Sequence, residues 1–162
     1  MADDPDPTAR RALALAHAIA AADPGEKAEV RRMGTEGAPV FWRQVVRLGI
    51  RPQEEADWLR IARLIALMTP ASTETSIHDK DRRFGAVLAA ADFSEQRLAR
   101  LLAARGTARA EALERAIRMI ARARPKLDVV GLARFALDRD GNATARAYYR
   151  ELDHQQTEAA RD

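Results

Sequence analysis

Apolar residues recur every three or four positions along most of this chain, and strand-like alternation is almost absent. One such stripe, in the segment that follows Pro52, consists of Trp58, Ile61, Ile65 and Met68. A stripe at this spacing is typical of a helix that buries one face. Pro, Gly, Asp and Ser separate the periodic segments in the order expected at helix starts and ends. The pattern therefore predicts an all-α fold.

The residues that start and end helices also predict where each helix lies. Asp6-Pro7, Pro39 and Pro52 open helices, while Gly34 and Gly49 end them. Asp92 or Ser94 caps one later helix that stops at Gly106, Thr107 caps the next, and Pro125 terminates it. We expect helices over residues 7–22, 25–33, 39–48, 52–68, 82–91, 94–105, 108–124, 128–137 and 143–159.

One long segment interrupts the helical pattern. Residues 69–83, TPASTETSIHDKDRR, have no apolar period and are rich in Ser, Thr and charged side chains, which predicts an exposed linker. The sequence therefore predicts two small helical bundles joined by a polar linker. The N-terminal bundle would cover residues 1–70, the linker 71–82, and a C-terminal bundle with a basic face 83–162.

The composition is that of a globular protein outside the membrane. The chain has 162 residues, of which 47% are hydrophobic and 31% charged, and no apolar run approaches the roughly 20 residues that cross a bilayer. The start, MADDPDPTARR, is acidic and polar, whereas a secretory signal is basic and then apolar. Cysteine is absent, which excludes disulfides and thiolate chemistry. We expect a cytoplasmic protein without a membrane partner.

Positive charge is concentrated in one part of the chain. The net charge is only +3, but residues 82–139 carry 13 basic and 6 acidic side chains. Of the 27 basic residues only Lys27, Lys80 and Lys126 are lysines. Arginine suits phosphate because its guanidinium presents a planar fork of donors. A GC-rich genome explains the arginine excess equally well, but it does not explain the clustering.

Catalytic and metal-binding patterns are weak. His17, His78 and His154 lie in three different segments, no His-x-x-x-His is present, and Glu151-x-x-His154 occurs once without further ligands. His78 and Asp81 could form one edge of a metal site, but they have almost no apolar neighbours. Gly-rich phosphate loops and nucleophile elbows are also absent. We therefore expect no enzyme, metal or cofactor, with a small hydrolase centred on SIHDKD as a minor alternative.

Two expected helices carry rows of arginines beside their apolar stripes. Arg97 and Arg100 project together from the helix over 94–105, with Arg105 at its end, and Arg115, Arg118 and Arg122 recur at i, i+3 and i+7 on the next helix. Like charges at this spacing repel one another, and a polyanion would reverse that effect. The alternative is a solvated surface with incidental arginines.

Aromatic side chains for base stacking are few. Phe41, Trp42 and Trp58 are expected in the core, which leaves only Phe93, Tyr148 or Tyr149 free. This favours contact with a nucleic-acid backbone over base reading.

Several segments in order make the chain similar to a known family. AEVRRM, FWRQV, FGAVLAAADFSEQRLARLLAARG and RARPKLDVVGLARFAL, spread over about residues 10–152, resemble the CasB family, the small subunit of the type I-E CRISPR Cascade complex. The resemblance implies a non-catalytic helical subunit, present as two copies beside the backbone and large subunits. It also implies binding of crRNA, target DNA and the displaced strand, which stabilises the R-loop in antiviral defence.

The resemblance also implies which individual residues bind nucleic acid. Arg31 and Arg32 match the early basic pair of the family, and Arg97, Arg100, Arg105 and Arg115 match or adjoin its second basic region, whereas Arg118 and Arg122 rest on the stripe. Arg82, Arg83, Lys126 and Arg139 are further candidates, although acidic residues flank Arg139. The competing hypothesis is an all-α adaptor that docks proteins without touching nucleic acid.

Overall fold

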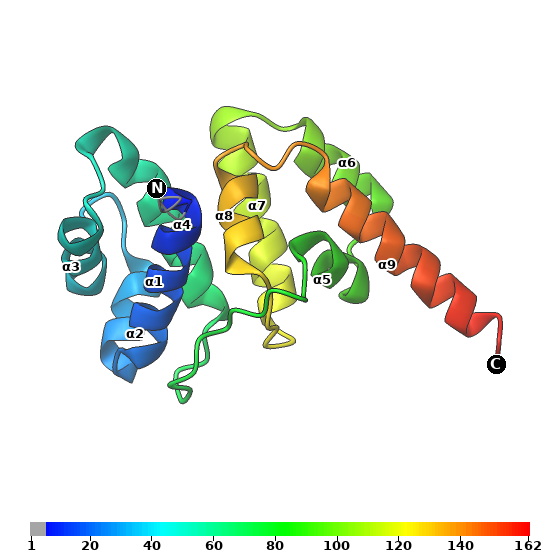
Figure 1. Cartoon of the computed structure of the whole chain (residues 1–162), viewed down its shortest axis with the longest axis horizontal. Helices are drawn as coiled ribbons and strands as arrows, with labels where there is room; N and C mark the ends of the chain where they lie inside the picture. The colour runs from blue at the N-terminus through cyan, green and yellow to red at the C-terminus, as the bar shows by residue number, and fades with distance from the viewer. Residues whose placement is uncertain (1–5) are drawn as a thin grey trace, which may run out of the picture.

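The computed structural model describes residues 6–162, and within this range the regular secondary structure is helical, without a strand (Figure 1). The elements are α1 (Pro7–Ala21), α2 (Pro24–Arg32), α3 (Pro39–Leu48), the 3-10 turn η1 (Pro52–Glu54), α4 (Glu55–Met68), α5 (Phe84–Ala90), α6 (Glu95–Ala103), α7 (Gly106–Ala121), α8 (Val129–Ala136) and α9 (Ala143–Ala159). The predicted all-α class is confirmed. Residues 1–5, which belong to the acidic start used to judge export, lie outside the described residues.

Short polar side chains begin four of these helices. Asp6, Asp23, Ser94 and Asp128 each accept a hydrogen bond from a backbone N–H of the first turn that would otherwise lack a partner. Gly49 ends α3 with a φ of 63°, in the left-handed region that suits glycine. The helix bounds therefore follow from residues visible in the sequence.

The start of α7 differs from the prediction. The helix begins at Gly106 and its N-cap is Arg105, so the expected cap at Thr107 is wrong. The preceding helix α6 already ends at Ala103, because Ala104 adopts an extended backbone conformation. Gly106 then takes a φ of 57°, which lets the chain turn directly from one helix into the next.

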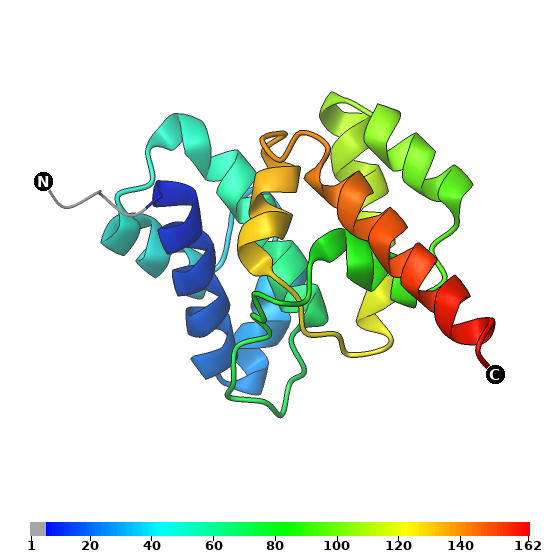
Figure 2. The same cartoon turned by 45° about the vertical axis from the view of Figure 1, so that its right-hand side comes forward.

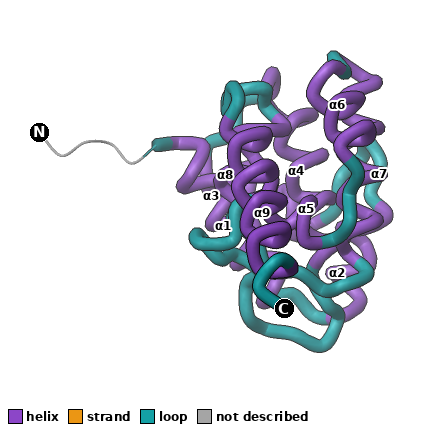
Figure 3. The backbone as a smooth tube through the Cα atoms, turned by 90° about the vertical axis from the view of Figure 1, so that its right-hand side faces the viewer, coloured by secondary structure: helices purple, strands orange, loops and turns teal. Residues whose placement is uncertain are grey.

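The helices of both chain halves share one hydrophobic core. Helix α1 packs against α4 and α8, α4 also packs against α7, and α5 pairs closely with α9 (Figures 1 and 2). Buried side chains from α1 through to α9 belong to this one core, and Figure 3 shows the helices from the end of α9. The expected arrangement of two separate bundles is therefore not confirmed, and a division at residues 71–82 stays a prediction.

The loop 69–83 is less exposed than expected. Lys27, on α2, is 1% exposed, and its ammonium donates to the carbonyl oxygens of Ala71 and Thr73. Farther along the loop, the side chain of Ile77 is buried in the core. The segment is irregular, as predicted, and most of residues 71–83 are exposed, but it is attached to the body of the protein at both ends.

His78 fixes the second end of this loop. Its Nδ1 atom accepts a hydrogen bond from the backbone N–H of Val129 at 3.2 Å, at the start of α8. Backbone bonds of 3.0 Å join Leu127 N to Ile77 O and Asp79 N to Leu127 O on either side of it. His78 is thus half-buried and serves as a helix cap, rather than lying in a solvated loop as expected.

Helices α5 and α9 approach each other at a glycine. A Cβ atom on Gly85 would lie 2.0 Å from the carbonyl oxygen of Thr144 and 2.8 Å from the backbone nitrogen of Tyr148. Next to this contact, the hydroxyl of Tyr148 donates to the carbonyl oxygen of Phe93, and both residues are buried. Of the three aromatics expected to be free, only Tyr149 is exposed.

A carboxylate between two arginines provides a test of the fold by pH. Glu54 accepts from Arg51 at 3.3 Å and from Arg11 at 3.1 Å, and these hydrogen bonds lower the pKa of Glu54 from 4.5 to about 2. Because the folded pKa is depressed, this stabilisation is present above pH 4.5 and is lost as the pH falls toward 2.

We therefore expect the wild-type protein to lose about 1 kcal/mol more of its unfolding free energy than Glu54→Gln between pH 6 and pH 3, after allowance for solvent screening. Urea unfolding at the two pH values measures this difference. Equal losses in the two proteins would show that the Arg11–Glu54–Arg51 cluster does not persist in solution.

Candidate nucleic-acid interface

Helix α6 presents two arginines on its exposed side. Ser94 caps the helix by accepting from the backbone N–H of Arg97 at 3.2 Å, and Leu98 and Leu101 bury the opposite face. Because the apolar residues fix the rotation of the helix, Arg97 and Arg100 are both directed outward and are exposed. The predicted basic side of this helix is confirmed.

Helix α7 presents three more arginines. Its predicted apolar stripe, Leu113, Ile117 and Ile120, is buried. Arg115, Arg118 and Arg122 are exposed, one to two turns apart along a second face of the helix. The local pattern of the sequence thus places both rows of arginine correctly.

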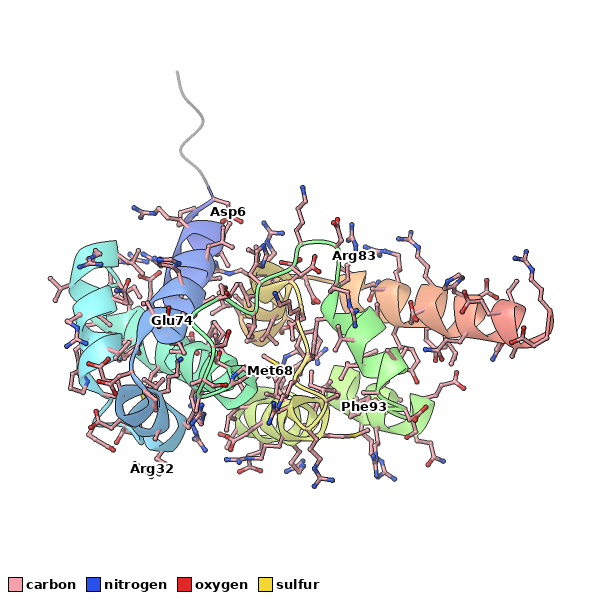
Figure 4. All side chains as sticks on the ribbon, turned by 90° about the horizontal axis from the view of Figure 1, so that it is seen from below. Asp6, Arg32, Met68, Glu74, Arg83 and Phe93 are labelled. Carbon is pink, nitrogen blue, oxygen red and sulfur yellow. The ribbon has the colours of Figure 1, made fainter. Side chains whose placement is uncertain are left out.

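The tertiary fold brings these two rows together. A surface groove of about 550 Å³ between α6 and α7, here named the α6–α7 groove, has arginines from both helices on its walls. Leu101, Ala112 and Ala116 line the same groove between them, and their small or apolar side chains leave room for a ligand. The complete lining is Phe93, Arg97, Arg100, Leu101, Ala112, Arg115, Ala116, Arg118, Met119 and Arg122. In Figure 4, nitrogen-tipped side chains project along the edge beneath α6 and α7.

Most of this positive charge is not neutralised. Arg118 forms an ion pair with Glu114 at 2.8 Å, and the same carboxylate accepts from Arg63 at 2.7 Å. Within residues 6–162, no carboxylate oxygen lies within 4.0 Å of the other four groove arginines, which are Arg97, Arg100, Arg115 and Arg122. The groove therefore concentrates like charges that an anionic ligand would relieve.

Four other candidates lie apart from the groove lining. Arg105 is exposed at the start of α7, where it donates to the carbonyl oxygens of Leu102 and Ala104 at 2.7 and 2.8 Å. Arg32 lies at the end of α2, and Arg82 and Lys126 lie in loops; all three are exposed. The structure does not place these four in the same cavity as Arg97 and Arg115.

Arg31 already has partners inside the fold. Its Nε atom donates to the carbonyl oxygen of Ala66 at 3.0 Å, and a terminal nitrogen donates to that of Thr69 at 2.7 Å. These carbonyls lie at the C-terminal end of α4, where a cation complements the helix dipole, and that of Ala66 also accepts from the backbone N–H of Thr69 at 3.2 Å. Arg31 therefore caps the end of α4, and its contact with nucleic acid stays a prediction.

A second basic cavity lies at the other end of α5. This cavity, of about 370 Å³, is lined by Arg83 and Arg139 and also by Arg134, which the sequence did not indicate. Asp128 and Asp140 line it as well, and Arg134 pairs with Asp6 at 2.6 Å. Arg83 and Phe93 are labelled in Figure 4 on opposite sides of α5. The cavity is nearer to charge balance than the α6–α7 groove.

The groove suits binding of phosphate groups better than reading of bases. Within the described chain, no three His, Asp or Glu side chains gather where they could hold a metal ion. The one aromatic at the groove, Phe93, is buried and leaves no free ring face for stacking. None of the described helices combines the length and the apolar character that a membrane span requires.

Comparisons with known proteins identify one family. The model of the family described as CRISPR-associated protein Cse2 matches residues 26–150, which include both cavities and helices α3 to α8. No curated protein and no solved structure matches the chain.

Proposed function

The chain belongs to the Cse2 family of CRISPR-associated proteins, which supplies a structural subunit of the Cascade complex, and from this we propose that its α6–α7 groove binds nucleic acid. This membership agrees with the resemblance to CasB noted in the sequence. The ligands we propose are the crRNA paired with its target DNA and the displaced strand, contacted through their phosphates.

One observation carries the proposal. Four arginines without a carboxylate partner converge from two helices on a single groove, and apart from Arg118, which pairs with Glu114, the rest of its lining is small or apolar. Guanidinium groups bind phosphate oxygens through parallel hydrogen bonds, and each phosphate neutralised releases counterions. Such a surface holds the sugar–phosphate backbone without selecting a sequence.

Modest phosphate contacts are sufficient for the proposed role. Exchange of a DNA duplex for an RNA–DNA heteroduplex is close to energetically balanced, so contacts to the backbone can tip it. Within this proposal the subunit stabilises the R-loop beside the backbone and large subunits of the complex, with a second copy of itself next to it. The second cavity, with Arg83 and Arg139, is a weaker candidate for another strand because carboxylates line it too.

Salt dependence provides the direct test. If about four phosphates are bound, the affinity for a 30-nucleotide DNA should fall roughly 20- to 50-fold between 0.1 and 0.3 M NaCl, in both single-stranded and duplex form. Oligonucleotides of equal length and different sequence should bind within about threefold of one another, because phosphate contacts carry no sequence information. Fluorescence anisotropy with the isolated subunit measures both quantities.

The adaptor hypothesis makes the opposite prediction. An all-α subunit that only docks proteins would show no affinity for either form of DNA at 50 mM NaCl while assembling normally with the other subunits. That outcome would refute nucleic-acid binding by the α6–α7 groove.

A further inference from the structure

The outer face of α3 is apolar at its centre, although the helix already has a buried face. Val40, Phe41, Val45 and Leu48 point into the core. The exposed residues form a second stripe, made up of Pro39, Trp42, Arg43, Val46 and Arg47. The side chain of Val46 is 84% exposed and that of Trp42 is 38% exposed, so the expectation that Trp42 lies in the core is wrong. We name this stripe the outer α3 face.

Trp42 is held rigidly although it lies at the surface. Its indole Nε1 donates to the carbonyl oxygen of Glu36 at 2.8 Å, and its ring meets that of Phe41 edge-on at 5.2 Å. Gly37 lies underneath with a φ of 72°, and a Cβ atom there would be only 2.6 Å from Nε1. An aromatic side chain fixed in this way loses little conformational entropy when it is covered by a partner.

The charged side chains of α3 itself, Arg43 and Arg47, are both positive. Arg43 and Arg47 follow Trp42 and Val46 in the stripe, and α3 contains no carboxylate. Arg43 reaches Glu26 of α2 only at 3.4 Å in an exposed pair, and Arg47 has no ion-pair partner within the described residues. Tryptophan and arginine are enriched among the residues that contribute most of the binding energy in protein interfaces. On the outer α3 face both residue types surround an aliphatic side chain.

A nucleic acid would not fit this face as well. The isopropyl group of Val46, the most exposed large apolar side chain among residues 6–162, offers a strand neither charge, hydrogen bond nor stacking surface. Covering it with another apolar surface removes that area from water, which is favourable. The occupant must therefore supply apolar contact at its centre and negative charge around it.

We infer that the outer α3 face docks a different protein chain of the effector complex, one that presents an apolar surface bordered by Asp or Glu side chains. Trp42 and Val46 make the apolar contact, while Arg43 and Arg47 pair with the carboxylates at the rim. The inference rests on the proposed membership of a complex, but not on nucleic-acid binding by the α6–α7 groove.

The test is reconstitution with the remaining purified subunits and crRNA. Val46→Glu places a negative charge at the apolar centre, and Arg47→Glu reverses a rim charge. We expect each variant to be incorporated at least about 10-fold less well than the wild type. Ala56→Glu, which changes the charge as much as Val46→Glu does and lies at an exposed position of α4, serves as the matched control for that variant and should be incorporated normally.

Two measurements on the isolated subunit separate this inference from its competitors. The melting temperature and the DNA affinity of Val46→Glu should equal those of the wild type, so that lost incorporation reflects docking alone. Normal incorporation of Val46→Glu would overturn the inference. So would quenching of Trp42 fluorescence by single-stranded DNA, or loss of self-association on ultracentrifugation, because these identify a nucleic acid or a second copy as the occupant.

Discussion

Replacing Arg97, Arg100, Arg115 and Arg122 together by alanine is expected to weaken DNA binding by about 100-fold or more at 0.1 M NaCl. Each lost phosphate contact removes one release of counterions, so the slope of log affinity against log salt should fall by about 3. These four arginines are the members of the α6–α7 groove without a carboxylate partner. Fluorescence anisotropy over a range of salt concentrations provides both the affinity and the slope.

The same variant should fold at least as well as the wild type. The four side chains are exposed, and removing neighbouring like charges relieves a repulsion of a few tenths of a kcal/mol per helical pair. A matched control replaces Arg10, Arg146, Arg150 and Arg161, four exposed arginines on α1, α9 and the C-terminal end, with the same loss of net charge. Equal weakening in both variants would attribute binding to total charge and contradict a specific groove.

Gly85→Ala is expected to destabilise the fold by about 3 kcal/mol, although alanine is normally the better residue in a helix by about 1 kcal/mol. The new Cβ would lie 2.0 Å from the carbonyl oxygen of Thr144 and 2.8 Å from the backbone nitrogen of Tyr148. Both atoms belong to the backbone of α9, so relief requires the two helices to move apart. For a chain of this length the melting temperature should fall by roughly 6–12 °C.

Gly25→Ala provides the control for this substitution. Its new Cβ would meet only the side-chain oxygen Oδ1 of Asp23, at 3.2 Å, in an exposed first turn. The expected change in unfolding free energy is below about 1 kcal/mol. Urea unfolding of both variants measures the difference, and a Gly85→Ala protein as stable as the wild type would contradict the close packing of α5 on α9.

The order and bounds of the helices could be predicted because the residues that cap and end them act over only a few positions of the sequence. Asp6 and Asp128 cap helices through hydrogen bonds that span only two residues, and Gly49 ends a helix through its own backbone freedom. The start of α7 was predicted wrongly because Arg105 caps it without a side-chain bond, which leaves no mark in the sequence.

The site was predictable only one helix at a time. The spacing of Arg115, Arg118 and Arg122 places them on one face, but whether that face lies beside Arg97 depends on how α6 packs on α7. Arg31 shows that the fold can also occupy a basic side chain with internal hydrogen bonds. No local pattern reveals that its donors reach carbonyls 35 and 38 residues away, so a count of charges does not show which arginines are already bonded within the fold.

Trp42 was misassigned for a similar reason. Both faces of α3 carry apolar side chains, so periodicity alone does not show which face points inward. The choice is made by packing, because Phe41 and Val45 fit against the helices beneath, whereas Trp42 is anchored outward on the turn at Gly37.

The two attachments of the loop 69–83 also restrict motion. Lys27 attaches one end of the loop to α2, and His78 attaches the other end to α8. The loop therefore does not act as a flexible hinge between the chain halves. Any protein that grips α3 consequently sets the direction in which the α6–α7 groove faces. The α6–α7 groove then has a fixed orientation before a nucleic acid binds. The subunit therefore loses little rotational freedom when the nucleic acid enters the groove.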